Sequence, residues 1–386
     1  MAIFSRSKRK SPVRDLTMGV DLIGEILNRT DQEMADMPPV NIMLIGKTGV
    51  GKSTLINEIF RENLADTGIG APVTPHLLKI TKTGVPLTLY DTKGLELSEE
   101  AQRMVQHEVV GLLKEKDLAA DPKEKIHCVW FCISSLSRRL EKTERIWINA
   151  LALQLPVIVV LTQALEESGT RELKEYIEQE CPQIRACIPV IARDYSIGPH
   201  TLPSFGLKEL MLTTFRNIPD ESQRAFINAQ RVDIDKKAEL ASRWARRFVY
   251  ETFAVGFIPI PFADAPIIAT SQVTMIAKIT AIFGISYDRA MLTSLVGAMA
   301  GIGGAVVTGR TLTTNILKLV PGAGTLVTGV ISGSTAAAIT LTMSKVYISA
   351  LREVSLREYA GERVLPEEIR YLVETEMRKY MERTRK

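Results

Sequence analysis

The chain of 386 residues has few cysteines, little excess charge and no secretory signal at its start. Its four cysteines are too sparse for a disulfide scaffold, and none stands at a zinc-type spacing from histidine. Two of them, Cys128 and Cys132, lie in an apolar run and are expected to be packed thiols. The net charge of +4 is close to balanced, so no nucleic-acid partner is expected. The missing signal predicts a reducing, cytoplasmic location.

Three regions of the chain differ in composition. Residues 1–38 combine a basic tail with an amphipathic helix around Leu16–Leu27; the tail is either solvated or attracted to an anionic membrane surface. Residues 39–220 alternate apolar runs with helical patterns, which predicts a mostly parallel α/β sheet with helices on both faces. Residues 221–386 predict an all-α, Gly/Ala-rich hydrophobic domain.

The middle region predicts a six-stranded sheet, and a proline within the last run, Pro189, places that strand at an edge or makes it shorter. The predicted strands are Val40–Ile45, Leu77–Lys82, Leu87–Asp91, Cys128–Ser134, Val157–Thr162 and Cys187–Ala192. The predicted helices are Lys52–Arg61, Ser98–Lys114, Glu141–Leu153, Thr170–Glu180 and Leu207–Phe215.

Residues 46–53 match the phosphate-binding pattern G-x-x-x-x-G-K-[ST] between a predicted strand and a predicted helix. The glycines let the backbone curl around a polyphosphate, and the helix N-terminus favours an anion. Lys52 is expected to reach the β- and γ-phosphates, and the Ser53 hydroxyl to ligate Mg²⁺. The predicted phosphate-side contacts are Gly46, Lys47, Thr48, Gly49, Val50, Gly51, Lys52, Ser53 and Thr54.

A second motif, Asp91-Thr92-Lys93-Gly94, follows an apolar strand. The Asp91 carboxylate is predicted to hold Mg²⁺, directly or through water, and the Gly94 N–H to meet the γ-phosphate. The preceding segment, residues 68–75, reads as a mobile linker. Thr74 in it is expected to close on Mg²⁺ and the γ-phosphate, with Thr67 as the competing choice.

With these motifs, residues 39–220 resemble a translation-factor-class GTPase domain, similar to the Era, septin and Toc branches. The resemblance implies binding of GTP or GDP with Mg²⁺. The base-reading motif departs from the family, because Leu165 replaces its aspartate and Gln163 its lysine. Thr162, Gln163 and Arg193 are the expected base-side contacts, and Glu166 or Glu167 is an alternative acceptor for guanine.

Catalysis departs from the family as well, since Leu95 follows Gly94 where some relatives have a glutamine that orients water. Intrinsic hydrolysis is therefore expected to be slow. Arg138 and Arg139 are proposed to act in trans in a homodimer formed through the nucleotide face; the alternative is two solvated loop arginines.

The C-terminal region contains two stretches without Asp, Glu, Lys or Arg, at residues 290–309 and 319–344. They predict either a membrane-embedded hairpin, with Arg310–Lys318 as its turn, or a buried Gly/Ala-rich bundle. Residues 245–350 resemble a YcjF-type domain of unknown function, which implies peripheral or integral membrane association, with a lipid or membrane protein as partner.

Three functions follow from these patterns. The leading one is a slow, Mg²⁺-dependent GTPase that acts as a conformational or dimerisation switch at a membrane. The second is a nucleotide-controlled scaffold with little hydrolysis, which the leucine at position 95 favours. The third is an ATP-using relative, which the leucine at position 165 keeps open.

Overall fold

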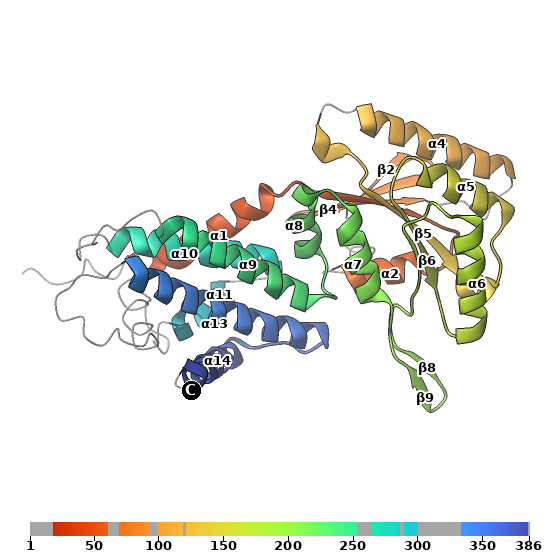
Figure 1. Cartoon of the computed structure of the whole chain (residues 1–386). Coiled ribbons are helices and arrows are strands. Elements are labelled where there is room, and N and C mark those ends of the chain that lie inside the picture. Colours follow the sequence, from red (N-terminus) through yellow and green to blue (C-terminus); the bar gives the residue numbers. More distant parts are fainter. Residues whose placement is uncertain are drawn as a thin grey trace, which may run out of the picture. The chain divides into compact units, whose positions relative to one another are not determined.

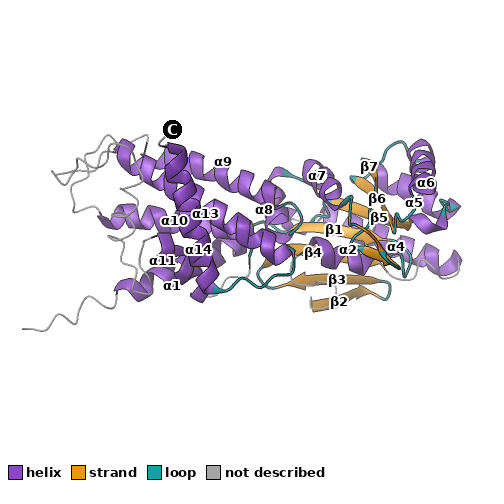
Figure 2. Cartoon of the chain, turned by 90° about the horizontal axis from the view of Figure 1, so that it is seen from below, coloured by secondary structure: helices purple, strands orange, loops and turns teal. Residues whose placement is uncertain are grey.

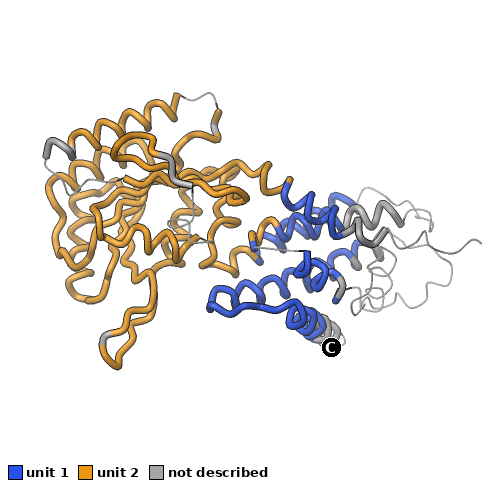
Figure 3. The backbone as a smooth tube through the Cα atoms, turned by 180° about the vertical axis from the view of Figure 1, so that it is seen from behind, with its two compact units in different colours: residues 1–31, 238–280, 285–386 blue, residues 32–237, 281–284 orange. Residues whose placement is uncertain are grey.

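The computed structural model describes residues 18–60, 69–92, 99–118, 121–253, 265–285, 289–299 and 333–384. The chain divides into two compact units (Figure 3). We call residues 32–237 with 281–284 the α/β unit, and the remainder, drawn from residues 1–31, 238–280 and 285–386, the helical unit.

The α/β unit is built on a seven-stranded sheet with the order β2-β3-β4-β1-β5-β6-β7 (Figure 2). Five strands run parallel, and β2 and β3 pair antiparallel at one edge. The predicted mostly parallel α/β fold is confirmed, with one strand more than expected. The strands are β1 (Val40–Ile45), β2 (Ile69–Thr74), β3 (Leu77–Lys82), β4 (Val85–Thr92), β5 (Cys128–Ser134), β6 (Val157–Thr162) and β7 (Ala186–Pro189).

Helices cover both faces of this sheet (Figure 1). One face packs against α2 (Lys52–Ile59), α7 (Leu207–Asn217) and α8 (Asp220–Ala229). The other packs against α4 (Glu99–Leu118), α5 (Lys142–Ala152) and α6 (Glu167–Glu180). Strands β1, β5 and β6 lie centrally and are apolar on both faces, which explains why their sequences are continuous apolar runs.

Two segments differ from the sequence-based expectation. The predicted linker at residues 68–75 is wrong over Ile69–Thr74, which forms edge strand β2; an edge tolerates Pro72, which has no N–H to donate. The last strand ends at Pro189 rather than Ala192 and lies at the other edge, as that proline indicated. It is followed by a hairpin that was not expected, β8 (Tyr195–Ile197) with β9 (His200–Leu202).

The helical unit contains segments of α1 (Met18–Ala35), α9 (Ile234–Phe253), α10 (Ala265–Phe283), α11 (Arg289–Met299), α13 (Gly333–Tyr359) and α14 (Pro366–Thr384). Polar contacts join its helices, one of them fully buried. The Tyr347 hydroxyl of α13 lies 2.6 Å from the Thr280 hydroxyl of α10, and the Ser349 hydroxyl donates to Glu376 of α14.

None of the described helices is long and apolar enough to cross a membrane. The two charge-free stretches are described only at their ends, since residues 300–332, including the predicted turn at Arg310–Lys318, lie outside the described residues. In the described ends, Leu292 and Leu295 of α11 and Met343 of α13 are buried within the helical unit.

Candidate nucleotide-binding site

The glycine loop connects the carboxyl end of β1 to the N-terminus of α2. Gly49 and Gly51 have φ angles of 80° and 97°, a left-handed conformation that glycine adopts without a steric penalty. Gly51 is the N-cap of α2, so the first amides of that helix face the loop. The predicted strand–loop–helix arrangement is therefore present, with an anion-favouring helix N-terminus at its end.

The loop is fixed against the two strands beside β1. A Cβ at Gly46 would lie 2.6 Å from the Cys132 carbonyl oxygen of β5, so only glycine fits there without displacement. From β6, the Thr162 hydroxyl donates to the Val50 carbonyl oxygen at 2.5 Å. Cys132 itself is buried, and burial raises the pKa of its thiol to about 12, so it stays protonated and serves as packing.

A buried ammonium group lies over the loop. Lys52 Nζ donates to the Gly46 carbonyl oxygen at 2.6 Å and lies 3.8 Å from Asp91 Oδ1 at the end of β4. The two side chains are only 8% and 13% exposed. The fold thus brings together two predicted residues that are 39 positions apart, one from each motif. Opposite charges this close, screened little by solvent, hold each other in place where phosphates and a cation are expected.

The donor set suits Mg²⁺ held together with a nucleotide. Ser53 is exposed in the first turn of α2, directly after Lys52, while Asp91 supplies a single carboxylate. Among the described residues no group of three or more His, Cys, Asp or Glu side chains surrounds a common point. Mg²⁺ in nucleotide sites uses one or two protein groups plus phosphate oxygens and water, so one hydroxyl and one carboxylate fit this ion.

Thr74 is engaged elsewhere. It ends β2, and its hydroxyl donates to Oε2 of Glu108 on α4, while Oε1 of the same carboxylate lies 3.1 Å from His76 Nδ1. Burial raises the pKa of Glu108, but these hydrogen bonds outweigh it and hold that pKa below its usual value. β2 lies two strands from β4, about 10 Å at the usual strand spacing, so Thr74 and Asp91 are not brought together. Thr67, Gly94 and Leu95 lie outside the described residues.

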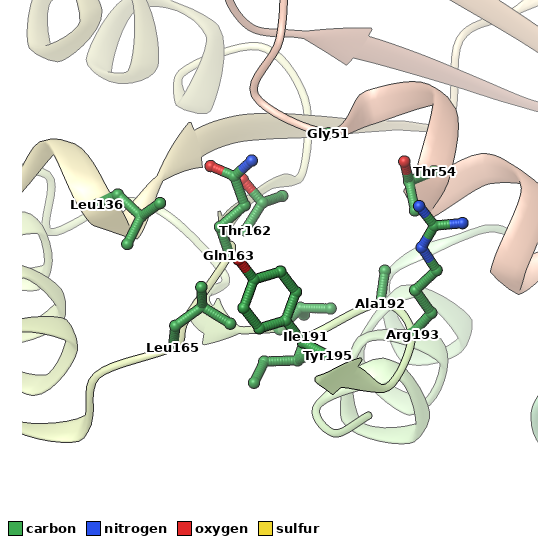
Figure 4. Close-up of a pocket in the computed structure, with 11 residues that line it drawn as sticks. Gly51, Thr54, Leu136, Thr162, Gln163, Leu165, Ile191, Ala192, Arg193 and Tyr195 are labelled. Atoms are coloured by element: carbon green, nitrogen blue, oxygen red, sulfur yellow. The ribbon is translucent and has the colours of Figure 1, made fainter. Parts of the chain in front are cut away.

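A pocket of about 230 Å³ opens beside the loop, where a base would follow the phosphates (Figure 4). Its lining includes the predicted contacts Thr162, Gln163 and Arg193. In Figure 4, Leu136 and Leu165 lie on one side, Arg193 extends toward Thr54 on the other, and the Tyr195 ring lies between them. Leu136 and Tyr195 were not expected from the sequence, because neither belongs to a motif.

The two glutamates considered as substitute base readers do not line this pocket. Glu166 is the N-cap of α6, where its carboxylate accepts from the Gly169 N–H and pairs with Arg138. Glu167 lies in the first turn of α6 and is exposed. Gln163 has a φ of 53°, unusual for a residue with a side chain, and its amide oxygen accepts a hydrogen bond from the Ser134 hydroxyl at 2.6 Å.

The two loop arginines follow the carboxyl end of β5, and the glycine loop follows the carboxyl end of the neighbouring parallel strand β1. Arg138 and Arg139 are 66% and 75% exposed. Arg138 pairs with Glu166, and Arg139 lies 3.6 Å from Glu141, which also accepts from Lys47. Exposed pairs of this kind contribute little to stability, so both guanidinium groups can be redirected at small cost.

Comparisons with known proteins agree with this geometry. Residues 41–163 match the family described as 50S ribosome-binding GTPase. Septin-9 of Rattus norvegicus is 25% identical over 197 residues, covering 44% of this chain and 34% of septin-9. Translocase of chloroplast 126 of Physcomitrium patens is 37% identical over 83 residues, covering 21% of this chain and 7% of the translocase. The chain thus spans about a third or less of these relatives.

One solved structure, an S. thermophilus NFeoB mutant bound to GDP, aligns with a TM-score of 0.31 and 13% identity. That alignment covers 89% of this chain and 97% of the other.

Proposed function

We propose that this chain binds GTP or GDP with Mg²⁺ through the glycine loop and hydrolyses GTP slowly. The observation that carries the proposal is the buried Lys52 ammonium, held over the loop and 3.8 Å from Asp91. The match of residues 41–163 to a GTPase family supports it. When bound, Mg²⁺ would supply positive charge that offsets the charge of the phosphates. Ser53 and Asp91 would hold that ion, Lys52 would meet the phosphates, and Gly94 would contact the γ-phosphate. Thr74 would contact the γ-phosphate after its hydroxyl leaves Glu108.

Affinity measured by calorimetry tests this binding mode. We expect Lys52→Met to weaken GTP·Mg²⁺ binding by about 10- to 150-fold, because it removes a buried, charge-assisted contact. Lys174→Met is the matched control outside the loop: its ammonium pairs with Glu178 on α6, so the affinity should change by less than about threefold. Equal losses in both variants would contradict the assigned role of Lys52.

We further propose that hydrolysis depends on a second protomer. Position 95 holds a leucine, which cannot orient water, so an arginine supplied in trans would complete the site; such a group adds about 10³–10⁵ in rate. Arg138 and Arg139 are the candidates because they are exposed and held only by surface pairs. A nucleotide-controlled scaffold with little hydrolysis is the alternative, which the same leucine favours.

The test is turnover per site as a function of protein concentration. A dimer-activated enzyme shows a rate per site that rises with concentration and falls in Arg138→Ala or Arg139→Ala. Arg145→Ala is the control, because Arg145 of α5 pairs with Glu180 of α6. A concentration-independent rate, unchanged in both loop variants, rejects the dimer mechanism.

The last element of the proposal is that the helical unit acts at a membrane, in line with the resemblance of residues 245–350 to a YcjF-type domain. The support is the sequence of the two charge-free stretches. Residues 300–309 of the first and 319–332 of the second lie outside the described residues. Flotation of the full chain with lipid vesicles tests this, with and without GTP·Mg²⁺. Protein that stays at the bottom of the gradient under both conditions rejects it.

A further inference from the structure

The base pocket beside the glycine loop lacks the group that reads guanine. Among the described residues that line it, none is Asp or Glu, and Leu165 occupies the position after the Thr162–Ala164 turn. Guanine presents two adjacent donors, N1–H and the 2-amino group, beside its O6 acceptor. Adenine presents the N1 acceptor and a C2–H in their place, beside its 6-amino donor. A carboxylate accepts both guanine donors at once, whereas a leucine accepts neither.

The remaining polar side chains of the pocket do not replace that acceptor. The Gln163 amide oxygen is already hydrogen bonded to the Ser134 hydroxyl, which leaves its NH₂ donors toward the pocket. The Thr162 hydroxyl donates its proton to Val50, and Arg193 has only donors. Glu166, the nearest carboxylate in sequence, caps α6 and pairs with Arg138. The described lining of the pocket therefore offers donors and the hydroxyl oxygens of Thr54 and Tyr195, but no carboxylate that could accept two donors at once.

What the pocket offers instead is apolar surface. Leu136, Leu165 and Ile191 line it together with the Tyr195 ring, which is 47% exposed at the start of β8 (Figure 4). Stacking on an aromatic ring and contact with aliphatic side chains depend on the face of a base, and every purine presents such a face. Recognition by this surface does not distinguish one purine edge from another.

We infer that this pocket accepts both guanine and adenine nucleotides, with affinity set by the phosphates and by stacking on Tyr195. The inference rests on the proposed nucleotide site and adds ATP as a second ligand. It assigns specificity to Leu165, whose side chain withholds an acceptor from guanine, and affinity for either base to the ring of Tyr195.

Calorimetric titration of the full chain with GTP·Mg²⁺ and ATP·Mg²⁺ tests the inference. The expected affinities lie within about tenfold of each other, because no bidentate pair discriminates the bases. Leu165→Asp should raise the preference for GTP over ATP by about 5- to 150-fold, the effect of one bidentate contact. Leu165→Ala, the control, shortens the side chain without adding an acceptor and should leave the ratio unchanged.

The outcomes separate this inference from the proposed function. A wild-type preference for GTP above about tenfold overturns the inference and leaves nucleotide binding intact. Failure of both nucleotides to bind rejects the proposed function itself. A Leu165→Asp variant that gains no guanine preference, with an unchanged melting temperature, also overturns the assignment of Leu165.

Substitutions at Tyr195 test the stacking part of the inference independently. Tyr195→Ala should weaken GTP and ATP by a similar factor, about 5- to 150-fold for the loss of one stacked ring, while Tyr195→Phe keeps both affinities. A loss confined to one nucleotide, or a loss in Tyr195→Phe equal to that in Tyr195→Ala, would show that the hydroxyl reads the base edge and would overturn the stacking account.

Discussion

Replacing Gly46 with alanine should separate the glycine loop from the sheet. The added Cβ would lie 2.6 Å from the Cys132 carbonyl oxygen, 3.1 Å from Cys132 Cβ and 3.2 Å from a methyl group of Val50. Ordinary contact begins near 3.4 Å, so the loop must move by about 0.8 Å. The carbonyl cannot yield easily because β5 pairs with β1 and β6 on its two sides. Overpacking of this kind costs about 1–3 kcal/mol.

Thermal unfolding measures the cost, and Gly111→Ala is the matched control. Gly111 lies within α4, and a Cβ there would meet no described atom within 4 Å, so alanine should stabilise the helix by about 0.5–1 kcal/mol. Gly46→Ala should lower the melting temperature by about 2–4 °C per kcal/mol. The rise in melting temperature on adding GTP·Mg²⁺ should also shrink in Gly46→Ala alone. Equal melting temperatures in the two variants would refute the reasoning.

Three further predictions concern single buried or bonded groups. Thr214→Val removes the acceptor 3.0 Å from the buried Trp130 indole N–H, so chemical denaturation should show a loss of about 1–3 kcal/mol, which Thr214→Ser restores. Burial lowers the pKa of His127 below 6.5, so protonation of this side chain favours the unfolded state. The free energy of unfolding should therefore fall as the pH drops below 6.5, and it should fall less steeply in His127→Asn. If Thr74 leaves Glu108 to reach the γ-phosphate, Glu108→Gln should favour that movement, because it weakens the hydrogen bond that holds Thr74. Titration should then show that the affinity for a non-hydrolysable GTP analogue, relative to that for GDP, rises by up to about tenfold. An unchanged affinity ratio would count against the movement.

The central strands of the sheet could be predicted from the sequence because they carry their own signal. Strands β1, β5 and β6 are continuous apolar runs, and the structure gives them the predicted bounds. Strand β2 could not be predicted, since Gly70 and Pro72 have low strand propensity and only pairing with β3 holds them extended. The strands of the β8–β9 hairpin have only three residues each, and its Gly198–Pro199 turn reads as an ordinary loop.

The candidate site divides in the same way. The approach of Lys52 to Asp91 follows from two motifs at the ends of neighbouring parallel strands, so the sequence predicts it. The engagement of Thr74 with Glu108, and of Glu166 with the first turn of α6, depends on side chains that only the folded chain brings together. Tyr195 reaches the base pocket through a hairpin that no motif marks. The roles given to Gly94 and to the loop arginines stay predictions.

The central claim is that the loop at residues 46–53 and the first turn of α2 hold the phosphates of a nucleotide. Amide hydrogen exchange of the full chain, followed with and without GTP·Mg²⁺, tests it most directly. At a ligand concentration about 100 times the dissociation constant, amides that exchange only when the nucleotide leaves should slow by about 100-fold. We predict this slowing at the loop and the start of α2. Unchanged exchange there, with slowing elsewhere in the α/β unit, would contradict the account.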